Sequence, residues 1–535
     1  MTPRARWTLI AAILGSGIVF LDSTVVNVAL PKMGRELPST IFGVLEAQSY
    51  VYNGYLLTLS ALLILAGALS DFFGRKRLFV LGLSGFLVTS ALCGIAPNFE
   101  LLVVFRVLQG VAGAVLVPGS LALLTVTFSG EAQGRAFGLW AGASAATTIL
   151  GPFVGGILVD ALSWRVAFLI NLPLCAIAIW ATLQHVGESR GEGASARFDW
   201  IGATVVALAV GGLSFGTIYG QQREWRDPLG FVLLAIGALA AVALPFLMTS
   251  RRDPLIPPEL FRSRNFTVTN ISTFLIYGGL YVVGYFLTLF VQGTVGFSAA
   301  AAGLGFIPSG LFLVFLSSRF GALAARRGPR VFMAIGPAIM TLGVLWYARV
   351  PATTTAWLFA ANDPSTWLPP ASYFTDFLPG SLLFGFGLAI MVAPLTTALM
   401  TSVPPGRSGV ASAINNAISR VGPQLAGALI FVAVTSSYYA ALQARVPSVD
   451  VNNPDVRRTI APLTVRLEDL RAAPGRQDDA SRIAAAEQAA STDAFHLAML
   501  IAAFLIASGA AVNAVGIRNR VPSTAEPAPA TATAD

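Results

Sequence analysis

The chain has 535 residues, of which 55% are hydrophobic and only 11% are charged, and its mean hydropathy is +0.72. One soluble core cannot bury so much apolar surface, so the composition excludes an ordinary globular protein and predicts an all-α integral membrane protein. The net charge of +8 indicates chain orientation and contact with anionic lipid, and we expect no nucleic-acid partner.

Fourteen apolar segments are long enough to cross a bilayer, since a transmembrane helix needs about 20 residues. The first six are predicted at residues 8–30, 46–69, 78–96, 101–125, 136–160 and 164–184. Two more follow at residues 200–220 and 229–249. The last six are predicted at residues 267–291, 300–322, 331–350, 376–402, 409–442 and 495–517.

The first six and the last six segments share a pattern, which indicates an internal repeat. The loops at 67–77 (GALSDFFGRKR) and 321–330 (GALAARRGPR) begin 254 residues apart, and each lies between two apolar segments. Repeated halves are typical of transporters. Further matching positions follow in the same order: Pro118 and Pro394, Gly138 and Gly409, and Gly151-Pro152 and Gly422-Pro423.

The repeat predicts fourteen transmembrane helices arranged as two pseudo-symmetric six-helix bundles plus two inserted helices. We assign residues 1–190 to the N-terminal bundle and residues 191–252 to the inserted helices. Residues 253–520 form the C-terminal bundle, which carries a long outer loop at 444–493. Residues 521–535 are rich in Ala, Pro and small polar residues and are predicted to be a disordered tail.

The distribution of Lys and Arg predicts the orientation in the membrane. With the amino terminus inside, the short inner loops carry 18 Lys and Arg residues and the short outer loops carry about six. We therefore expect a multi-pass protein of the cell's inner (plasma) membrane with both termini in the cytoplasm. Arg4 and Arg6 precede the first segment, but no small-residue cleavage site follows, so an uncleaved first span is predicted.

The sequence lacks the motifs of several enzymes and pumps. Neither Lys32 nor Lys76 follows a glycine, so there is no Gly-Lys phosphate loop. His185 and His496 are more than 300 residues apart, and neither belongs to an HExxH sequence. Residues 212–216 match GxSxG but lie within an apolar segment, where small residues favour close helix packing. We expect no enzymatic activity, no cofactor and no metal ion.

Charged residues deep in the apolar segments are candidates for moving protons. Asp22 is in the first segment, and Arg106 is in the fourth, where Gln109 follows on the same helical face. A change in the separation of Asp22 and Arg106 would let Asp22 bind and release a proton. The alternative is a static ion pair that ties the two helices together. Arg420, a third deep charge, is assigned to conformational gating.

Five short stretches carry the pattern of a known family. They are residues 21–31 (LDSTVVNVALP), 67–77, 106–113 (RVLQGVAG) and 164–173 (WRVAFLINLP), and the fifth-span positions Gly138, Gly142, Gly151, Pro152, Gly155 and Gly156. Together they resemble the major facilitator superfamily, and specifically its fourteen-span drug:proton antiporters of the EmrB/QacA type. The resemblance implies that Arg106 and Asp22 take part in proton transfer and that the fifth-span pattern marks an exporter.

The loop after the second segment is a predicted conformational element. Gly67 and Gly74 permit tight turning, and Asp71 can accept hydrogen bonds from a helix amino terminus. Arg75 and its basic neighbours anchor the loop on the inner side. The resemblance implies a latch that forms when the cytoplasmic side is closed, and the alternative is a simple topological anchor.

The Gly-Pro pair in the fifth segment predicts a bend in that helix. Pro152 cannot donate a backbone hydrogen bond, and proline kinks a helix. The neighbouring glycines are expected to let this helix pack closely against the opposing half. The alternative is a passive kink.

These patterns predict a proton-coupled efflux transporter, an antiporter that exports amphipathic or lipophilic small molecules such as drugs by alternating access. Its expected partners are a small-molecule substrate, protons and the lipid bilayer, and we expect a monomer. One alternative is an exporter of a lipid or an endogenous secondary metabolite. Another, of a different class, is a non-transporting membrane receptor or scaffold. The predicted substrate-binding residues are uncharged donors and acceptors in apolar surroundings: Tyr50, Asn53, Gln109, Asn171, Gln292, Asn415 and Asn416.

Overall fold

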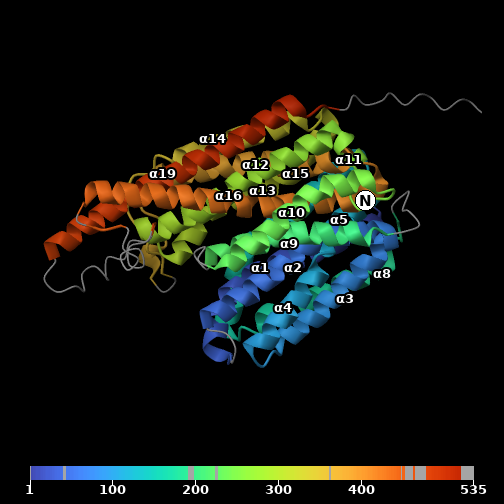
Figure 1. The fold of residues 1–535 in the computed structure, drawn as a ribbon, viewed down its shortest axis with the longest axis horizontal. Coiled ribbons are helices and arrows are strands. Elements are labelled where there is room, and N and C mark those ends of the chain that lie inside the picture. Colours follow the sequence, from blue (N-terminus) through green and yellow to red (C-terminus); the bar gives the residue numbers. More distant parts are fainter. Residues whose placement is uncertain are drawn as a thin grey trace, which may run out of the picture.

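The computed structural model describes residues 2–39, 44–190, 198–222, 227–360, 363–447, 449–451, 462–463 and 477–519. This part of the chain is helical and contains no strand, which confirms the predicted all-α class (Figure 1). The elements before residue 190 are α1 (Pro3–Glu36), α2 (Val44–Phe73), α3 (Arg75–Gly94), α4 (Phe99–Gly113), α5 (Leu116–Thr127), α6 (Gly130–Ala161), α7 (Val166–Leu169) and α8 (Asn171–His185). Two helices follow, α9 (Trp200–Gln222) and α10 (Pro228–Ser250).

The rest of the described chain contains long helices joined by short π and 3₁₀ turns. These elements are α11 (Glu259–Arg262), α12 (Arg264–Leu289), η1 (Phe290–Val295), α13 (Ala299–Arg327), α14 (Arg330–Tyr347), η2 (Pro364–Thr366), η3 (Tyr373–Phe377), α15 (Leu378–Thr401), η4 (Pro405–Arg407), α16 (Ser408–Arg445) and α19 (Gln477–Gly516). About half of the predicted outer loop at 444–493 lies outside the described residues, and α19 makes the end of that range helical. The predicted tail at 521–535 also lies outside them.

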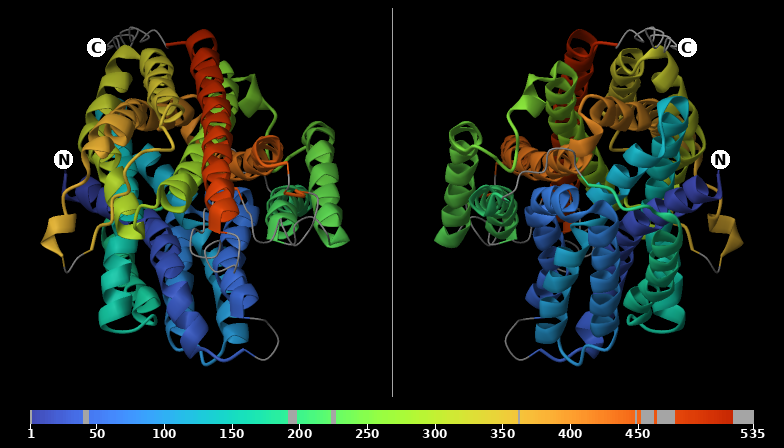
Figure 2. Two further views of the ribbon diagram at one scale, coloured as in Figure 1. Left: turned by 90° about the vertical axis from the view of Figure 1, so that its left-hand side faces the viewer. Right: turned by 90° about the vertical axis from the view of Figure 1, so that its right-hand side faces the viewer.

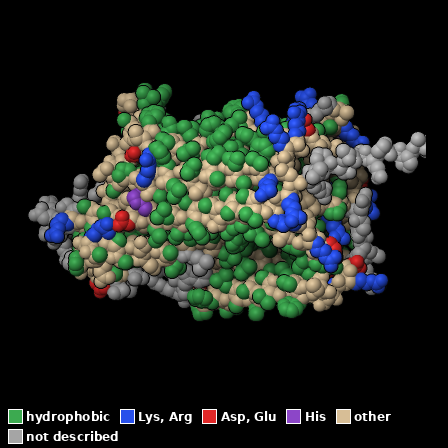
Figure 3. All heavy atoms as spheres, turned by 90° about the horizontal axis from the view of Figure 1, so that it is seen from above, with side chains coloured by type: hydrophobic (Ala, Val, Ile, Leu, Met, Phe, Trp, Pro, Cys, Tyr) green, Lys and Arg blue, Asp and Glu red, His purple; other side chains and the backbone are tan. Residues whose placement is uncertain are grey.

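The helices have the length and the surface of transmembrane segments. Among the described residues, 13 helical segments are long and apolar enough to cross a bilayer. The remaining predicted span, at 136–160, falls within α6, which has 32 residues. Leu81, Leu239 and Phe246 are 67%, 71% and 68% exposed, and Figure 3 shows an apolar belt between the two ends of the molecule. Such a surface suits lipid rather than water, so the chain is a multi-pass membrane protein.

The helices form two halves that lie side by side (Figures 1 and 2). The first half contains α1–α8, in blue and cyan, and the second contains α12–α19. One apolar cluster holds only residues between 276 and 517, and another holds only residues between 25 and 168. A third cluster combines Phe79 and Leu124 of the first half with Val410 and Ile414 of the second. Among the described residues, this third cluster is the apolar core that the two halves share.

Proline and glycine explain two local features of the packing. The predicted span at 101–125 is divided between α4 and α5, because Pro118 has no N–H for the carbonyl of Ala114. At the flank, α9 packs closely on α10 (green in Figure 2), and a Cβ on Gly212 would lie 2.8 Å from Gly237 Cα. The GxSxG stretch thus serves helix packing. α9 also contacts α2 and α16, one helix from each half.

Candidate functional site

An ion pair is embedded in the first half. Asp22 of α1 and Arg106 of α4 are both 0% exposed, and Arg106 Nη1 donates to Asp22 Oδ2. Arg106 Nε donates to the carbonyl oxygen of Val51 at 3.0 Å. The guanidinium carbon of Arg106 lies 4.2 Å from the ring centre of Tyr55. The pair therefore connects α1, α2 and α4 in the interior of one bundle.

Amide side chains hold the carboxylate of this pair in place. Gln109 Nε2 and Asn171 Nδ2 donate to Asp22 Oδ1 at 3.1 Å and 3.0 Å. Both amides also donate to Ser90 Oγ, at 2.7 Å and 3.1 Å. Arg106 and Gln109 reach the same carboxylate because they are three residues apart on α4. Gln109 and Asn171 therefore orient Asp22, whereas their sequence positions had predicted substrate binding.

The cluster around Asp22 is not fully satisfied. Arg106 Nη2 and Asn171 Oδ1 have no hydrogen-bond partner among the described residues. An unsatisfied buried donor or acceptor costs about 1–3 kcal/mol. That cost lowers the free-energy difference between this arrangement and one in which Arg106 changes partners.

A central cavity of about 300 Å³ lies between the two halves. Two predicted substrate-binding residues, Asn415 and Asn416 of α16, line it. Tyr50 and Asn53 of α2 are half-buried and lie outside its lining, and Gln292 in η1 is exposed. The residues that line the cavity are Val19, Phe20, Ser23, Tyr55, Leu56, Leu59, Leu121, Trp140, Ala141, Ser144, Tyr277, Val392, Leu395, Thr396, Leu399, Asn415, Asn416, Ser419 and Arg420.

Tyr55 separates the cavity from the ion pair. One part of this residue lines the cavity, and its ring packs on the guanidinium of Arg106. Its hydroxyl donates to the carbonyl oxygen of Val19 at 3.2 Å. Asp22 and Arg106 have no exposed surface, so solvent does not contact the ion pair in this conformation. Sequence reasoning missed Tyr55, whose only signal is a phenol within an apolar span.

The junction of α2 and α3 contacts the second half through a charged network. Gly74 is the one non-helical residue between 67 and 77, so Gly67, which was predicted to permit a tight turn, lies within α2. Asp71 Oδ1 accepts from Arg75 Nε and Nη2 at 2.9 Å and 2.8 Å, and Asp71 Oδ2 accepts from the backbone N–H of Val410 at 3.1 Å. Val410 is in the first turn of α16, where a carboxylate also meets the positive end of the helix dipole. Arg75 is buried and donates to the carbonyl oxygen of Pro405 at 2.6 Å. We call the end of the molecule that carries residues 67–77 the latch end.

Replacing Asp71 with Asn is expected to reduce transport several-fold while leaving the amount of protein in the membrane unchanged. Asn keeps one acceptor oxygen but loses the charge that pairs with Arg75 and with the α16 dipole, which weakens the closed latch end by about 1–3 kcal/mol. The measurement is the initial transport rate at equal protein density. A rate equal to that of the unchanged protein would show that the loop only anchors the chain.

Glycines allow the halves to touch backbone to backbone at the latch end. A Cβ on Gly67 would lie 2.5 Å from the carbonyl oxygen of Gly409, and a Cβ on Gly134 would overlap the carbonyl oxygen of Gly321. Gly138 instead lies against Ser318, one helical turn away. The contacts therefore match Gly134, and not Gly138 as the spacing suggested, with Gly409. The predicted match rested on spacing, because Gly138 and Gly409 each lie thirteen residues before a Gly-Pro pair. The contacts between the halves instead make Gly134 the equivalent position.

The fifth-span glycines are divided between two partners. A Cβ on Gly155 would lie 2.8 Å from Val25 Cγ1 of α1, and Gly151 lies against Thr24 of the same helix. These two glycines thus pack within their own half, which differs from the predicted contact with the opposing half. The glycines nearer the start of α6 make that contact with α13: Gly134, Gly138 and Gly142. Pro152 and Gly156 belong to α6, but their surroundings lie outside the described part.

Gly74 has a conformation that requires glycine. Its φ is +113°, a region that side chains with a Cβ rarely adopt. A Cβ there would also lie 2.8 Å from a carboxylate oxygen of Glu188. Glu188 accepts from the backbone N–H of Lys76 at 3.1 Å, which caps the start of α3. The turn is thereby held in the geometry that presents Asp71 and Arg75 to the second half.

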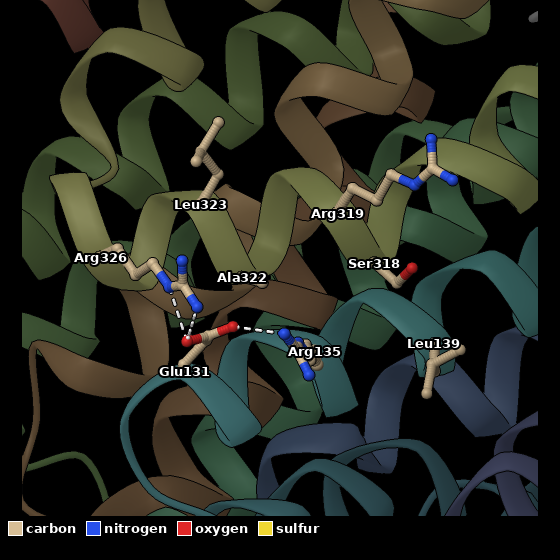
Figure 4. Close-up of a pocket in the computed structure, with 8 residues that line it drawn as sticks. All are labelled: Glu131, Arg135, Leu139, Ser318, Arg319, Ala322, Leu323 and Arg326. Atoms are coloured by element: carbon tan, nitrogen blue, oxygen red, sulfur yellow. Dashed lines mark hydrogen bonds and ion pairs between the residues drawn. The ribbon is translucent and has the colours of Figure 1, made fainter.

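A second charged contact joins the halves in an exposed groove between α6 and α13 (Figure 4). Glu131 of α6 pairs with Arg326 of α13, and it also accepts from Arg135 Nη2 at 2.6 Å. The hydrogen bond from Arg326, together with the charges of both arginines, holds the pKa of Glu131 below its usual value. A lowered pKa means that the contact is complete above the usual range of a carboxyl group and is lost only in more acidic solution.

Replacing Glu131 with Gln is therefore expected to have a small effect. Exposed ion pairs contribute little, so the transport rate should change by less than about twofold. Because the pKa of Glu131 is lowered, its removal should leave the shape of the pH profile unchanged between about pH 5.5 and 8. The measurement is the transport rate against pH. A shifted profile would assign Glu131 a part in proton coupling.

Comparisons with known proteins agree with this arrangement. The chain is 30% identical, over 87% of its length, to the multidrug resistance protein Stp of Mycobacterium tuberculosis (strain CDC 1551 / Oshkosh), of which 82% is covered. It is 33% identical, over 82% of its length, to the puromycin resistance protein pur8 of Streptomyces alboniger, of which 84% is covered. The solved structure of the human organic anion transporter MFSD10 (TETRAN) has a similar fold, with a TM-score of 0.55, 16% identity, and coverage of 95% of this chain and 100% of that one. A sequence model of the Major Facilitator Superfamily matches residues 12–427, and the chain belongs to that family.

Proposed function

We propose that the protein is a proton-coupled efflux transporter that exports amphipathic organic molecules by alternating access. The observation that carries this proposal is the central cavity, which both halves line and which lies beyond a tightly closed latch end. A ligand held there is bound by both halves, so movement of one half against the other can change the side from which it is reached.

The contacts between the halves support such a movement. Hydrogen bonds and ion pairs join the two halves at the latch end, as at Asp71, Arg75 and Glu131. The shared apolar cluster extends from this end to the cavity wall, where it includes Tyr55 and Trp140, and each half also has a cluster of its own. Separation of the latch end would therefore break a limited set of contacts and leave each bundle intact.

The charge distribution supports an orientation with the latch end in the cytoplasm. Figure 3 shows Lys and Arg side chains gathered at the end that carries the amino terminus, and cytoplasmic loops are enriched in these residues. The end of α19 lies at this end as well, since Arg330 Nε donates to the carbonyl oxygen of Ala514. In this orientation, within the plasma membrane, the conformation is closed to the cytoplasm. Because one chain supplies both walls of the cavity, a monomer is sufficient to form the transport site.

The direction of transport is supported by the names of the relatives, which describe multidrug and puromycin resistance. Export of a toxic compound from the cytoplasm is the simplest way for a membrane transporter to give resistance. The cavity wall suits amphipathic ligands, because aromatic and aliphatic side chains alternate with amides and hydroxyls. Another relative is the tetracenomycin C resistance and export protein of Streptomyces glaucescens, and its name supports export of a secondary metabolite as an alternative substrate class.

Proton entry supplies the driving force in this proposal, through the Asp22–Arg106 pair. A membrane potential of about 100 mV provides roughly 2.3 kcal/mol for each charge that moves inward. Protonation of Asp22 would release Arg106, whose guanidinium packs on Tyr55 in the cavity wall. A change at the ion pair can therefore alter the shape of the cavity through one aromatic ring.

Cells provide a first test of the proposal. Cells that produce the protein should accumulate less of some compounds in a panel of amphipathic drugs and dyes, and an uncoupler that collapses the proton gradient should remove the difference. Equal accumulation with and without the protein for every compound would contradict efflux. A non-transporting receptor or scaffold would also tolerate neutral residues at Asp22 and Arg106, whereas the transporter would not.

A further inference from the structure

Arg420 differs from the other deep arginines because nothing neutralises it. Arg106 pairs with Asp22, and Arg75 pairs with Asp71. Arg420 is half-buried in the wall of the central cavity and makes no hydrogen bond or ion pair with any residue in the described part of the chain. A charge within a membrane protein is costly unless it is paired or serves a function. The cavity therefore contains a cation for which the described part of the chain supplies no counter-charge.

The other residues that line the cavity are uncharged. Arg420 is the one charged residue among those that line the cavity, and no Asp or Glu is present in this lining. The buried carboxylate of Asp22, in the first half, is bound by Arg106, Gln109 and Asn171 behind Tyr55. The walls have low polarity, so the field of Arg420 is weakly screened. This field favours an anion over a cation of the same size in the cavity.

The side chains near Arg420 define what such an anion looks like. Asn416 and Ser419 precede Arg420 on α16 and line the cavity with it, but their donors bond within α16, to Ser412 and to the carbonyl oxygen of Asn416. The guanidinium of Arg420 is therefore the main donor available to a ligand on this face. Across the cavity, Phe20, Trp140 and Leu399 form apolar walls. A guanidinium binds carboxylates through two parallel hydrogen bonds and binds other oxyanions strongly. A whole diacyl lipid is much larger than a cavity of about 300 Å³, so a small molecule is the occupant.

We propose that the central cavity selects lipophilic organic anions, with a carboxylate or another oxyanion bound by Arg420 and the apolar part of the molecule held between the two halves. This inference rests on the proposed transport function and names its substrate class. It also changes the role of Arg420 from the predicted gating to ligand binding. Outward movement of a monoanion is electrically equivalent to inward movement of one positive charge. Exchange for one proton therefore moves a net two positive charges inward, and the membrane potential would drive this export more strongly than export of a neutral compound.

The test compares two fluorescent compounds that share one skeleton, 1-pyrenebutyrate and its neutral amide. Binding is measured by equilibrium dialysis with the purified full-length protein in nanodiscs of phosphatidylcholine, with empty nanodiscs as the blank. The unchanged protein should bind the carboxylate at least about tenfold more tightly than the amide. Arg420→Gln should remove this preference and leave the affinity for the amide within about twofold. Arg420→Lys should retain part of it, because Lys keeps the charge but not the paired hydrogen bonds.

A matched control is Arg319→Gln, which removes a cation from the exposed groove of Figure 4 and leaves the cavity unchanged. This variant should keep the full preference for the carboxylate. Folding is checked by thermal unfolding, where the carboxylate should raise the melting temperature of the unchanged protein but not of Arg420→Gln. Equal affinities of the unchanged protein for carboxylate and amide, or an undiminished preference in Arg420→Gln, would overturn the inference. Displacement of the carboxylate by phosphatidylglycerol in the nanodisc would also overturn it, in favour of a lipid headgroup.

Transport assays separate this inference from the function on which it rests. The assay uses vesicles with an imposed pH gradient. If both the unchanged protein and Arg420→Gln move the amide, and the unchanged protein moves the carboxylate no faster, proton-coupled transport is supported and anion selection is refuted. A binding preference for the carboxylate in the absence of any gradient-driven movement would support the site and refute the proton-coupled function.

Discussion

We expect Asp22→Asn to abolish proton-driven transport, with a rate at least about tenfold below that of the unchanged protein. Asn cannot bind and release a proton, but it keeps the shape and one acceptor oxygen of Asp22. The change also leaves Arg106 buried without a counter-charge, and breaking a buried ion pair in this way costs about 3–5 kcal/mol of folding free energy. The measurement is the rate of substrate movement in vesicles with an imposed pH gradient, together with the melting temperature.

Two further variants separate coupling from stability. Asp199→Asn is the matched control, because Asp199 is a buried carboxylate that pairs with Arg251 at 3.0 Å outside the cavity. This variant should lose some stability and keep its coupling. The double variant Asp22→Asn/Arg106→Gln removes the unpaired charge, so it should recover melting temperature without recovering transport. Gradient-driven transport by Asp22→Asn at the normal rate would assign the pair to a static role.

Gly67→Ala should prevent closure of the latch end and reduce transport at least about tenfold. A Cβ on Gly67 would lie 2.5 Å from the carbonyl oxygen of Gly409 and 2.6 Å from Ala413 Cβ. Both obstacles belong to helix backbone or to a Cβ, so neither can rotate away, and α2 must separate from α16. Ala411, which is 0% exposed in the shared apolar cluster, reports the result. A cysteine introduced there should react slowly with a permeant maleimide, and at least about tenfold faster when Gly67→Ala is added.

Gly303→Ala provides the control for this substitution. Gly303 is in α13, and a Cβ built on it has nothing within 4 Å. The same change there should leave both the transport rate and the labelling of the cysteine at position 411 unaltered. Slow labelling in Gly67→Ala, together with normal transport, would show that the two halves do not rely on this backbone contact.

The sequence predicted the parts of this structure that depend on local composition. Runs of about 20 apolar residues give the membrane spans directly. The repeat also predicted a turn between the second and third spans; the turn is at Gly74, whereas Gly67 and Asp71 lie in the last turns of α2. The spacing of Arg106 and Gln109 also placed both on one face of a helix. What these residues meet is decided by how the helices pack.

Contacts between distant helices were beyond the reach of sequence patterns. Asn171 donates to Asp22 across 149 positions of the chain, and the sequence near these two residues does not predict that bond. The contacts of α6 with α13 pair Gly134 with Gly321, whereas the sequence had matched Gly138, one helical turn away, with Gly409 of the repeat. Arg420 has ordinary neighbours along α16, so only the packed structure reveals that it enters the cavity without a counter-charge.

The most direct test of proton-coupled alternating access uses purified protein in sealed vesicles that contain a pH-sensitive dye. Addition of a transported compound should cause proton movement in the opposite direction, in proportion to the amount of compound moved, and Asp22→Asn should abolish both movements. Equal compound movement with the gradient present or collapsed, and no proton movement on addition of the compound, would contradict the account.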